Sequence, residues 1–412
     1  MSKQFPGRFI LAADITLTSP MNIAAAEKGR YVFDGGRPRI VRYDGGPSSP
    51  GLQCTLTRTH RVMVDVGVSE SDDGDRAAGQ TGVDLPVIPA SSITGKLRNL
   101  AAGLVFESFK ERGLQITTDV FNMMTTGSAT NDINASDATA QIVMLARKDA
   151  FLSNFGGTSF MLSSNAVIST GWPLVQLTRG MLMSPELLPT EALPDLKWTR
   201  QMTSALAIVR KDTVREMRSP YLTEVIAMDD LVSFAQAKAA EAESTKASKA
   251  AQRAAKAAGE FVEADKKRDL RTLSSIETVN TGMSFALRVR VNAATPAQLG
   301  LMVLAFQRML QEGQIGGKVS RGLGQFICNA SRIIEVDPRT NRPLDNGSPL
   351  FLSRDEGYEV AGISDDQSSA LVQAVMAGKD YLHEVAPKTL QAYSDAVTDY
   401  LKKLYEEEQE AA

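Results

Sequence analysis

The chain has 412 residues, of which 43% are hydrophobic and 23% charged, and its formal net charge is −3. This composition is typical of a soluble globular protein with one elaborated domain or two domains, and nucleic-acid binding would require local basic surfaces. Two cysteines and two histidines argue against a disulfide framework or a structural zinc site, and the lack of a signal-like or 18-residue apolar stretch favours a cytoplasmic protein.

The N-terminal part of the chain predicts strands separated by a long polar insertion. Residues 7–20, GRFILAADITLTSP, alternate apolar and polar side chains and stop at a proline, which predicts a strand. Residues 28–83 are rich in Gly, Pro, Asp and Arg, and within them 56–68 is a second strand candidate. The first predicted strand is therefore followed by a large insertion.

A helix is predicted within residues 83–113, after a strand or loop. Ser91 or Ser92 is the expected N-cap, and an approximate apolar stripe follows at Leu97, Leu100, Leu104 and Phe106. Residues 114–150 are polar and Thr/Asn/Asp-rich in their middle, which predicts an insertion loop that leads into a short helix.

Residues 233–269 differ in kind from the rest, since they contain 13 alanines in 37 residues. Alanine and lysine favour a helix, but the segment offers little to bury. Four basic residues fall at helical spacing on one face, namely Lys246, Lys249, Arg253 and Lys256. Either a solvated helical arm or a basic stripe that meets nucleic acid or a neighbouring subunit would fit this pattern.

The C-terminal part predicts strand, helix, glycine loop and strand in succession. Residues 281–294 alternate strongly, and 295–313 form an apolar helix whose start suits Thr295 as N-cap and Pro296 in the first turn. The loop GGKVSRGLG, residues 316–324, comes next, and a strand follows it. Residues 364–409 predict two helices separated near Pro387. The succession of strand, helix, glycine loop and strand assigns the chain to the α+β class.

The glycine loop fails the requirements of a nucleotide-binding motif. A P-loop needs G-x-x-x-x-G-K-[ST], but around Lys318 the first position is Glu312 and the last is Val319. Around Lys96 the last position is Leu97, and a G-x-G-x-x-G that starts at Gly322 ends at Ile327. No nucleotide cofactor is expected.

Nothing in the sequence requires an enzyme. The carboxylates of residues 28–83 form no recognisable acid/base pair, and His60 stands alone between two arginines. No metal ligand set and no catalytic residue are predicted.

Two segments have the composition of phosphate-binding sites, because exposed backbone N–H groups and basic side chains bind anions. The first begins the helix in 89–101 and offers Ser91, Ser92, Thr94, Gly95, Lys96 and Arg98. The second is the glycine loop with Gly316, Gly317, Lys318, Ser320, Arg321 and Gly322. Each segment alone could be a tight turn with surface charge, but two of them would suit a repeating phosphodiester.

The order of several motifs resembles the RAMP superfamily of CRISPR proteins, and in particular its backbone (seventh Cas family) subunit. The motifs are ILAADITLTSPMNIA, VIPASSITGKLR, NFGGTSF, VRKDTVREM, ETVNTGMSFALRVRV and GGKVSRGLGQF, and they cover most of residues 8–330. LTRTHRV, with Arg58 and Arg61, precedes PVIPASSITGKLR and looks most like the type IV branch.

This resemblance implies a modified ferredoxin-like (RRM-like) palm with inserted finger and thumb elements and a helical arm. The palm would span residues 1–330, with insertions at about 28–83, 114–150 and 225–277, and 331–412 would be a mostly helical C-terminal extension.

The resemblance also implies a role in antiviral defence, as a non-catalytic subunit that binds CRISPR RNA and presents it to target nucleic acid. Copies of the chain would stack head to tail beside other effector subunits, and Met123 or Met124 could wedge between bases. The alternative is a type III-like subunit that cleaves target RNA with a loop aspartate, for which Asp34 is the candidate.

Overall fold

The computed structural model describes most of the chain. The described residues are 6–34, 37–42, 52–66, 79–127, 140–157, 162–174, 202–209, 273–317, 319–344, 346–354, 357–362 and 369–411. The alanine-rich segment 233–269 and Lys318 lie outside them, so the predictions made for these residues stay predictions.

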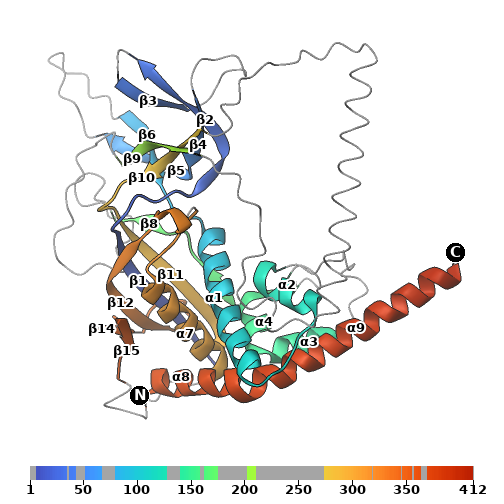
Figure 1. Ribbon diagram of the computed structural model, residues 1–412. Coiled ribbons are helices and arrows are strands. Elements are labelled where there is room, and N and C mark those ends of the chain that lie inside the picture. Colours follow the sequence, from blue (N-terminus) through green and yellow to red (C-terminus); the bar gives the residue numbers. More distant parts are fainter. Residues whose placement is uncertain are drawn as a thin grey trace, which may run out of the picture.

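A central antiparallel sheet forms the base of the molecule (Figure 1). Strand β1 (Gly7–Leu17) lies in its middle and pairs with β11 (Ser284–Ala294) on one side and β12 (Phe326–Val336) on the other. The short strands β7 (Ala166–Ile168) and β8 (Trp172–Pro173) pair with β11, and β13 (Ser348–Pro349) pairs with β12. The strands expected at 7–20 and 281–294, and the one expected after the glycine loop, are thus confirmed.

Two helices cover one face of this sheet, because alternate side chains of β1 supply an apolar surface. Helix α1 (Ala90–Glu111) connects β1 to β7 by way of the inserted elements, and helix α7 (Pro296–Glu312) connects β11 directly to β12. On the helix side β1 buries Phe9, Leu11 and Ile15 completely. The chain therefore runs strand, helix, strand, strand, helix, strand through the sheet, in the spatial order β12-β1-β11-β7.

The two helix starts differ in how well the sequence predicted them. Thr295 caps α7, as expected, and it also forms a capping box with Gln298. Helix α1 instead begins at Ala90 with Pro89 as N-cap, so the prediction of Ser91 or Ser92 as the cap is wrong. An isolated bridge between Ile88 and Gly171 holds the chain extended up to Pro89, and the helix starts directly after it.

The described residues between 24 and 86 form more strands than the one that the sequence predicted at 56–68. Strands β2 (Ala24–Asp34), β3 (Arg37–Arg42), β4 (Leu52–Thr57), β9 (Thr203–Val209) and β10 (Leu273–Val279) make a second sheet above the first in Figure 1. Strands β5 (Thr59–Val66) and β6 (Gly79–Pro86) form a separate hairpin. The single strand expected at 56–68 is thus divided at Arg58 into the end of β4 and all of β5.

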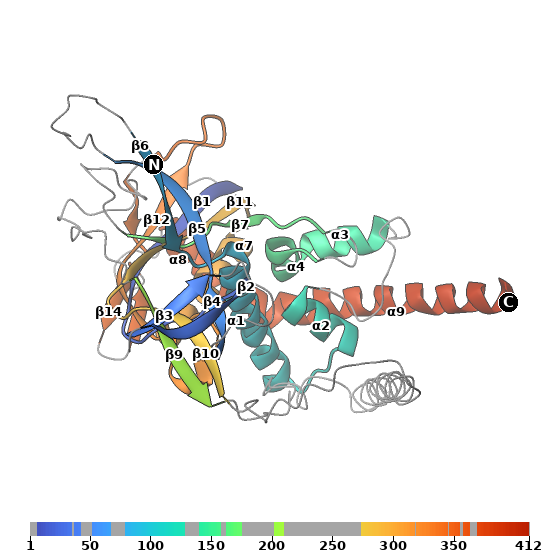
Figure 2. The ribbon, with the colours of Figure 1, turned by 90° about the horizontal axis from the view of Figure 1, so that it is seen from above.

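The insertion at 114–150 contains more helix than the sequence predicted. Helices α2 (Thr118–Thr126) and α3 (Ala140–Lys148) flank the long helix α9 (Ala386–Ala411), as Figure 2 shows, and α4 (Ala150–Phe155) packs on α7. Asp149 caps α4 and accepts hydrogen bonds from Tyr381 Oη at 2.8 Å and Thr389 Oγ1 at 2.7 Å. This buried carboxylate ties the insertion to the C-terminal part of the chain.

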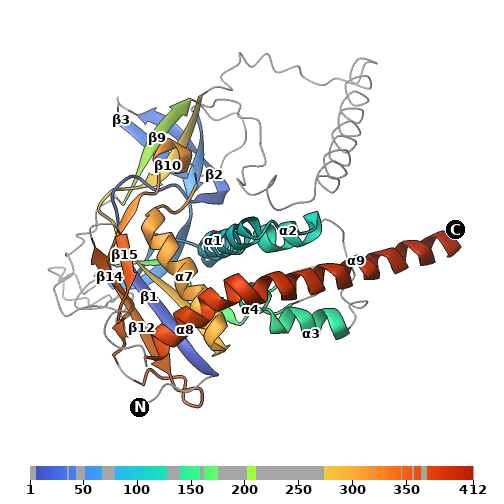
Figure 3. The same cartoon turned by 60° about the horizontal axis from the view of Figure 1, so that its bottom comes forward.

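The C-terminal residues pack into the same core as the sheet. Helix α8 (Ala370–Asp380) lies beside α7 (Figure 3), and the pair of predicted helices is joined through the π-helical turn η4 (Tyr381–Val385) just before Pro387. Proline has no N–H for the helical ladder, so a change of helix type is expected near it. The boundary proposed at 330/331 falls within β12, and the small hairpin β14 (Phe351–Arg354) and β15 (Gly357–Val360) follows.

In the part of the chain that the structure describes, no helix combines the length and apolar character that a membrane crossing needs.

Candidate nucleic-acid interface

A short strap, residues 18–23, connects β1 to β2 and contacts the glycine loop. Gly324 N donates to Pro20 O at 2.8 Å, and Gly317 N donates to Asn22 O at 2.7 Å. The strap thereby fixes both ends of the loop against the top of the central sheet.

The loop glycines serve two different purposes. At Gly324, φ is +75° and a Cβ would lie 1.8 Å from Ile315 O, so only glycine fits. A Cβ on Gly316 would lie 2.8 Å from Asn22 O at φ +95°. Gly322 also has a positive φ of +77°, but no atom lies within 4 Å of its Cβ position, so this side of the loop is open.

The remaining loop residues are placed only in part. The 3-10 turn η3 (Val319–Arg321) forms the tip of the loop, and Ser320 within it is exposed. The side chain of Arg321 is outside the described residues, as is Lys318.

Arg58 lies next to the same strap. Its N–H donates to Ile23 O at 2.8 Å, and its carbonyl accepts from Val87 N at 3.1 Å, three residues before α1 begins. Its side chain is exposed. Arg61 lies opposite Asp84 in the β5–β6 hairpin, and its side chain is outside the described residues.

The first turn of α1 contains no acidic residue, and no side chain caps it with a hydrogen bond. Ser91 is exposed, Ser92 is half-buried, and neither hydroxyl has a partner among the described residues. Thr94 Oγ1 donates to Ala90 O at 2.8 Å within the helix, and the Cβ position of Gly95 is open. The turn therefore offers backbone N–H groups and two hydroxyls to an anion.

An ion pair joins the first predicted phosphate-binding segment to the helix that precedes the second. Lys96 Nζ contacts the Glu312 carboxylate at the end of α7, directly ahead of the glycine loop. The structure therefore brings the start of α1, the glycine loop and Arg58 together at one junction. Lys96 is the one member of the predicted set that already has an anionic partner in the described part of the chain.

Arg98 does not belong to this surface, although the sequence placed it there. Its side chain is buried, and its guanidinium donates to Met123 O at 3.0 Å, to Gly156 O at 3.1 Å and to Phe155 O. Burial lowers the pKa of the guanidinium, and the three carbonyls satisfy its N–H groups. Arg98 is a structural link between α1, α2 and α4.

The predicted wedge residues are also internal. Met123 is 2% exposed and Met124 is fully buried, and both belong to the main core. The prediction that either could insert between bases is wrong, because α2 turns these side chains toward α1 and α9 instead of toward solvent.

Glu277 supports the junction and was not found by sequence analysis. Its backbone carbonyl accepts from Asn22 Nδ2 at 2.8 Å, and its carboxylate accepts from Thr57 N and Thr203 Oγ1 at 2.9 and 2.8 Å. All three contacts are long-range in sequence, and Glu277 is 2% exposed. A charged residue in a strand gives no local sign of such a role.

Asp34 lies at the end of β2 and pairs in register with Arg37 of β3. The candidate nuclease residue is therefore at the turn of a hairpin in the upper sheet, and its side chain is outside the described residues. Among the residues that the structure describes, no group of three or more His, Cys, Asp or Glu side chains could hold a metal ion.

Comparison with known proteins gives weak structural similarities, including one to a chain of a CRISPR complex. No family model matches the chain, and no curated protein is similar to it. A chain of a Type IV-B CRISPR Complex has 14% sequence identity and a TM-score of 0.39, over 78% of this chain and 89% of that chain. Similarity at this level does not establish a shared fold, and no role is transferred from that protein.

Proposed function

We propose that the chain is a non-catalytic, guide-RNA-binding backbone subunit of a CRISPR effector ribonucleoprotein, of the RAMP superfamily and most like its type IV branch. The observation that carries this proposal is the strap 18–23, which joins the glycine loop to Arg58 beside the start of α1. Two separate anion-binding segments at one junction suit a polymer of phosphates.

The topology of the central sheet supports a ferredoxin-like palm. Two strand–helix–strand units in the spatial order β12-β1-β11-β7 correspond to strand order 4-1-3-2 of a βαββαβ fold. The second sheet and the helices α2 to α4 would then be the inserted finger and thumb elements.

The proposed binding mode is independent of sequence. Phosphates would contact the N–H groups and hydroxyls at the start of α1 together with Gly317, Lys318, Ser320 and Arg321 of the loop. Lys96 and Arg58 would add positive charge from α1 and from the residue before β5. Base pairing with target nucleic acid would be left to the guide, and further copies would continue along it in a head-to-tail filament with other effector subunits.

The test is RNA binding by the full chain, measured by fluorescence anisotropy with a labelled short RNA. We expect Lys96→Ala combined with Arg321→Ala to weaken binding by about tenfold and to flatten its salt dependence, since lost phosphate contacts release fewer counterions. Arg339→Ala is the matched control, because Arg339 is an exposed arginine on a turn after β12. Equal binding by the double variant and the parent would refute the proposed interface.

The type III-like alternative is tested by incubating the assembled complex with complementary RNA and measuring whether the RNA is cleaved. We expect no cleavage. Regularly spaced cuts that disappear in Asp34→Ala would replace the non-catalytic proposal with a nuclease.

A further inference from the structure

The face of the central sheet opposite the helices has an unusual pattern of residues. On β1 this face presents Ile10, Ala12, Asp14 and Thr16, and a small apolar cluster with Leu174, Ala286 and Ile334 covers part of it. Asp14 is only 7% exposed and lies between Ala286 of β11 and Ala330 of β12. The residues that pair with Asp14 on both neighbouring strands are thus alanines.

One oxygen of the Asp14 carboxylate is a hydrogen-bond acceptor that receives no hydrogen bond. Its Oδ1 atom is buried and has no hydrogen-bond partner in the described part of the chain. A buried acceptor left unmatched costs free energy, and such atoms in native proteins usually have a water or a ligand as partner.

A cavity of about 10 Å³ lies against this carboxylate and is lined by Ala12, Ala13, Asp14, Ala330, Ser331 and Arg332. That volume holds one water-sized group. The cavity fits a water molecule or a single hydroxyl group that displaces it, whereas a base or a phosphate is too large.

Positive charge flanks the cavity on both neighbouring strands. Arg288 of β11 and Arg332 of β12 both pair in register with Ala12 and lie close enough to act electrostatically on Asp14. Strand spacing places their Cα atoms about 10 Å apart across β1. Positive charge on both sides of the Asp14 carboxylate disfavours a metal ion in this cavity and favours an anionic ligand that also bears a hydrogen-bond donor.

A polar row connects this cavity to the candidate interface. Thr16 Oγ1 lies 2.7 Å from Ser284 Oγ and accepts from Asn329 Nδ2 at 2.6 Å, and β1 then leads into the strap. Asp14 is four residues from Thr18, about 13 Å along a strand, so one extended polynucleotide can reach both places.

We infer that this sheet face binds the ribose–phosphate backbone of single-stranded RNA, with a 2′-hydroxyl donating to Asp14 Oδ1 and the flanking phosphates attracted by Arg288 and Arg332. This inference rests on the proposed function and adds discrimination of RNA from DNA, because only RNA has the donor that the cavity fits.

The experiment compares the binding of one labelled sequence as RNA, as DNA and as 2′-O-methyl RNA, which keeps the phosphates but lacks the hydroxyl donor. For the unchanged full-length chain we expect RNA to bind about tenfold more tightly than either analogue, as for one hydrogen bond to a charged group. In Asp14→Leu the affinities for RNA, DNA and 2′-O-methyl RNA should become equal, because the affinity for RNA falls while the other two stay unchanged.

Two further variants complete the test. Asp14→Asn keeps an acceptor oxygen and should retain part of the preference, which makes the inference testable even if Asp14→Leu fails to fold. Arg288→Gln combined with Arg332→Gln should weaken RNA and DNA equally and reduce the salt slope by about 1.4, whereas Arg339→Gln should change neither.

The outcomes distinguish this inference from the function on which it rests. Unchanged RNA preference in both Asp14 variants, with binding still weakened in the Lys96 and Arg321 double variant, would overturn the inference and leave the proposed function intact. Loss of self-association in the Arg288 and Arg332 double variant at unchanged RNA affinity would make the face a protein interface instead. Absence of RNA binding by the unchanged chain would remove both proposals.

Discussion

At the scale of single residues, Arg98 shows how a basic side chain can look like a ligand contact and act as a structural link. Its three carbonyl partners come from two different segments, Met123 and Phe155–Gly156, which no local pattern connects. The sequence predicts that a helix-start arginine is exposed, whereas the fold surrounds it with α2 and α4.

Arg98→Gln should therefore destabilise the protein strongly. The change removes the charge-assisted donors and leaves buried carbonyls unmatched, for an expected loss of about 3 kcal/mol in the free energy of unfolding. Lys96→Gln, two positions earlier, should cost about 0.5 kcal/mol, because its ion pair with Glu312 lies at the surface. Urea unfolding followed by circular dichroism measures both, and similar midpoints for the two variants would contradict the structural role of Arg98.

Asp14 predicts a stability that depends on pH. Burial raises the pKa of its carboxyl from 3.8 to about 6, and the charges of Arg288 and Arg332 offset this only in part. The folded state therefore binds a proton more tightly than the unfolded chain, so this group lowers stability as pH rises from about 4 to about 6.

The corresponding variant is Asp14→Asn, which removes the cost of burying a charge. Its melting temperature should exceed that of the parent by about 2 °C near neutral pH, and the difference should narrow toward about pH 4.5. Thermal unfolding at the two pH values measures this. An equal advantage at both would show that ionisation of Asp14 is not its cause.

At the scale of elements, the close contact between α7 and α8 depends on two glycines. A Cβ on Gly300 of α7 would lie 1.8 Å from Ala374 O of α8, and one on Gly378 would lie 2.6 Å from the carbonyl carbon of Gly300. The backbones of α7 and α8 can approach this closely only because neither position carries a side chain.

Gly300→Ala should force the helices apart and cost about 3 kcal/mol. The same substitution at Gly95 of α1 has the opposite expected sign, a gain of about 0.5 kcal/mol, since its Cβ position is open and alanine favours a helix interior. Chemical denaturation of both variants tests the contact. Equal and small changes would mean that α7 and α8 do not pack at this distance in solution.

The elements that the sequence predicts well are those whose signal is local. Alternation identifies β1 and β11, and Thr295 with Pro296 marks the start of α7. Among the strands of the described residues 24–86, only β5 and the end of β4 were predicted. The others were missed because Gly, Pro and charged residues are not typical of strands, and because β2, β3 and β4 belong to a sheet that β10 and β9 complete from far along the chain. The N-cap of α1 was predicted two or three residues too late, because the bridge between Ile88 and Gly171 determines where the helix starts.

At the scale of the whole molecule, the candidate site also combines features that a local sequence pattern shows with features that only long-range contacts create. The residue types of the two anion-binding segments are evident from the sequence, but their proximity is a result of the strap and of the Lys96–Glu312 contact. Asp14 was part of a predicted strand and had no sign of function, since an orphan acceptor and its cavity exist only after three strands have paired.

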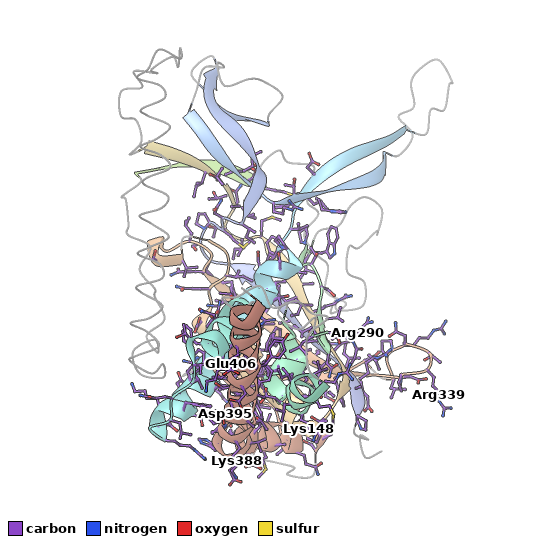
Figure 4. All side chains as sticks on the ribbon, turned by 90° about the vertical axis from the view of Figure 1, so that its right-hand side faces the viewer. Lys148, Arg290, Arg339, Lys388, Asp395 and Glu406 are labelled. Carbon is purple, nitrogen blue, oxygen red and sulfur yellow. The ribbon has the colours of Figure 1, made fainter. Side chains whose placement is uncertain are left out.

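The C-terminal helix divides into a part that packs and a part that extends away from the body, where the C-terminus stands clear of the other elements (Figures 1 and 3). Leu390, Tyr393 and Val397 are buried, whereas the outer face carries charges of both signs, including Lys388, Asp395 and Glu406 (Figure 4). Among the side chains that the structure describes, this packed face reaches as far as Tyr400, and we expect the turns after it to contribute little to folding.

A chain that ends at Tyr400 should therefore melt within about 1 °C of the full chain, because it keeps the buried face and the link from Thr389 to Asp149. A chain that ends at Pro387 loses that link and the apolar contacts of α9 with α2 and α3, which amounts to several fully buried side chains at about 2 kcal/mol each. It should unfold or melt far lower. Comparable losses in the two truncated chains would show that the distal turns of α9 also stabilise the fold.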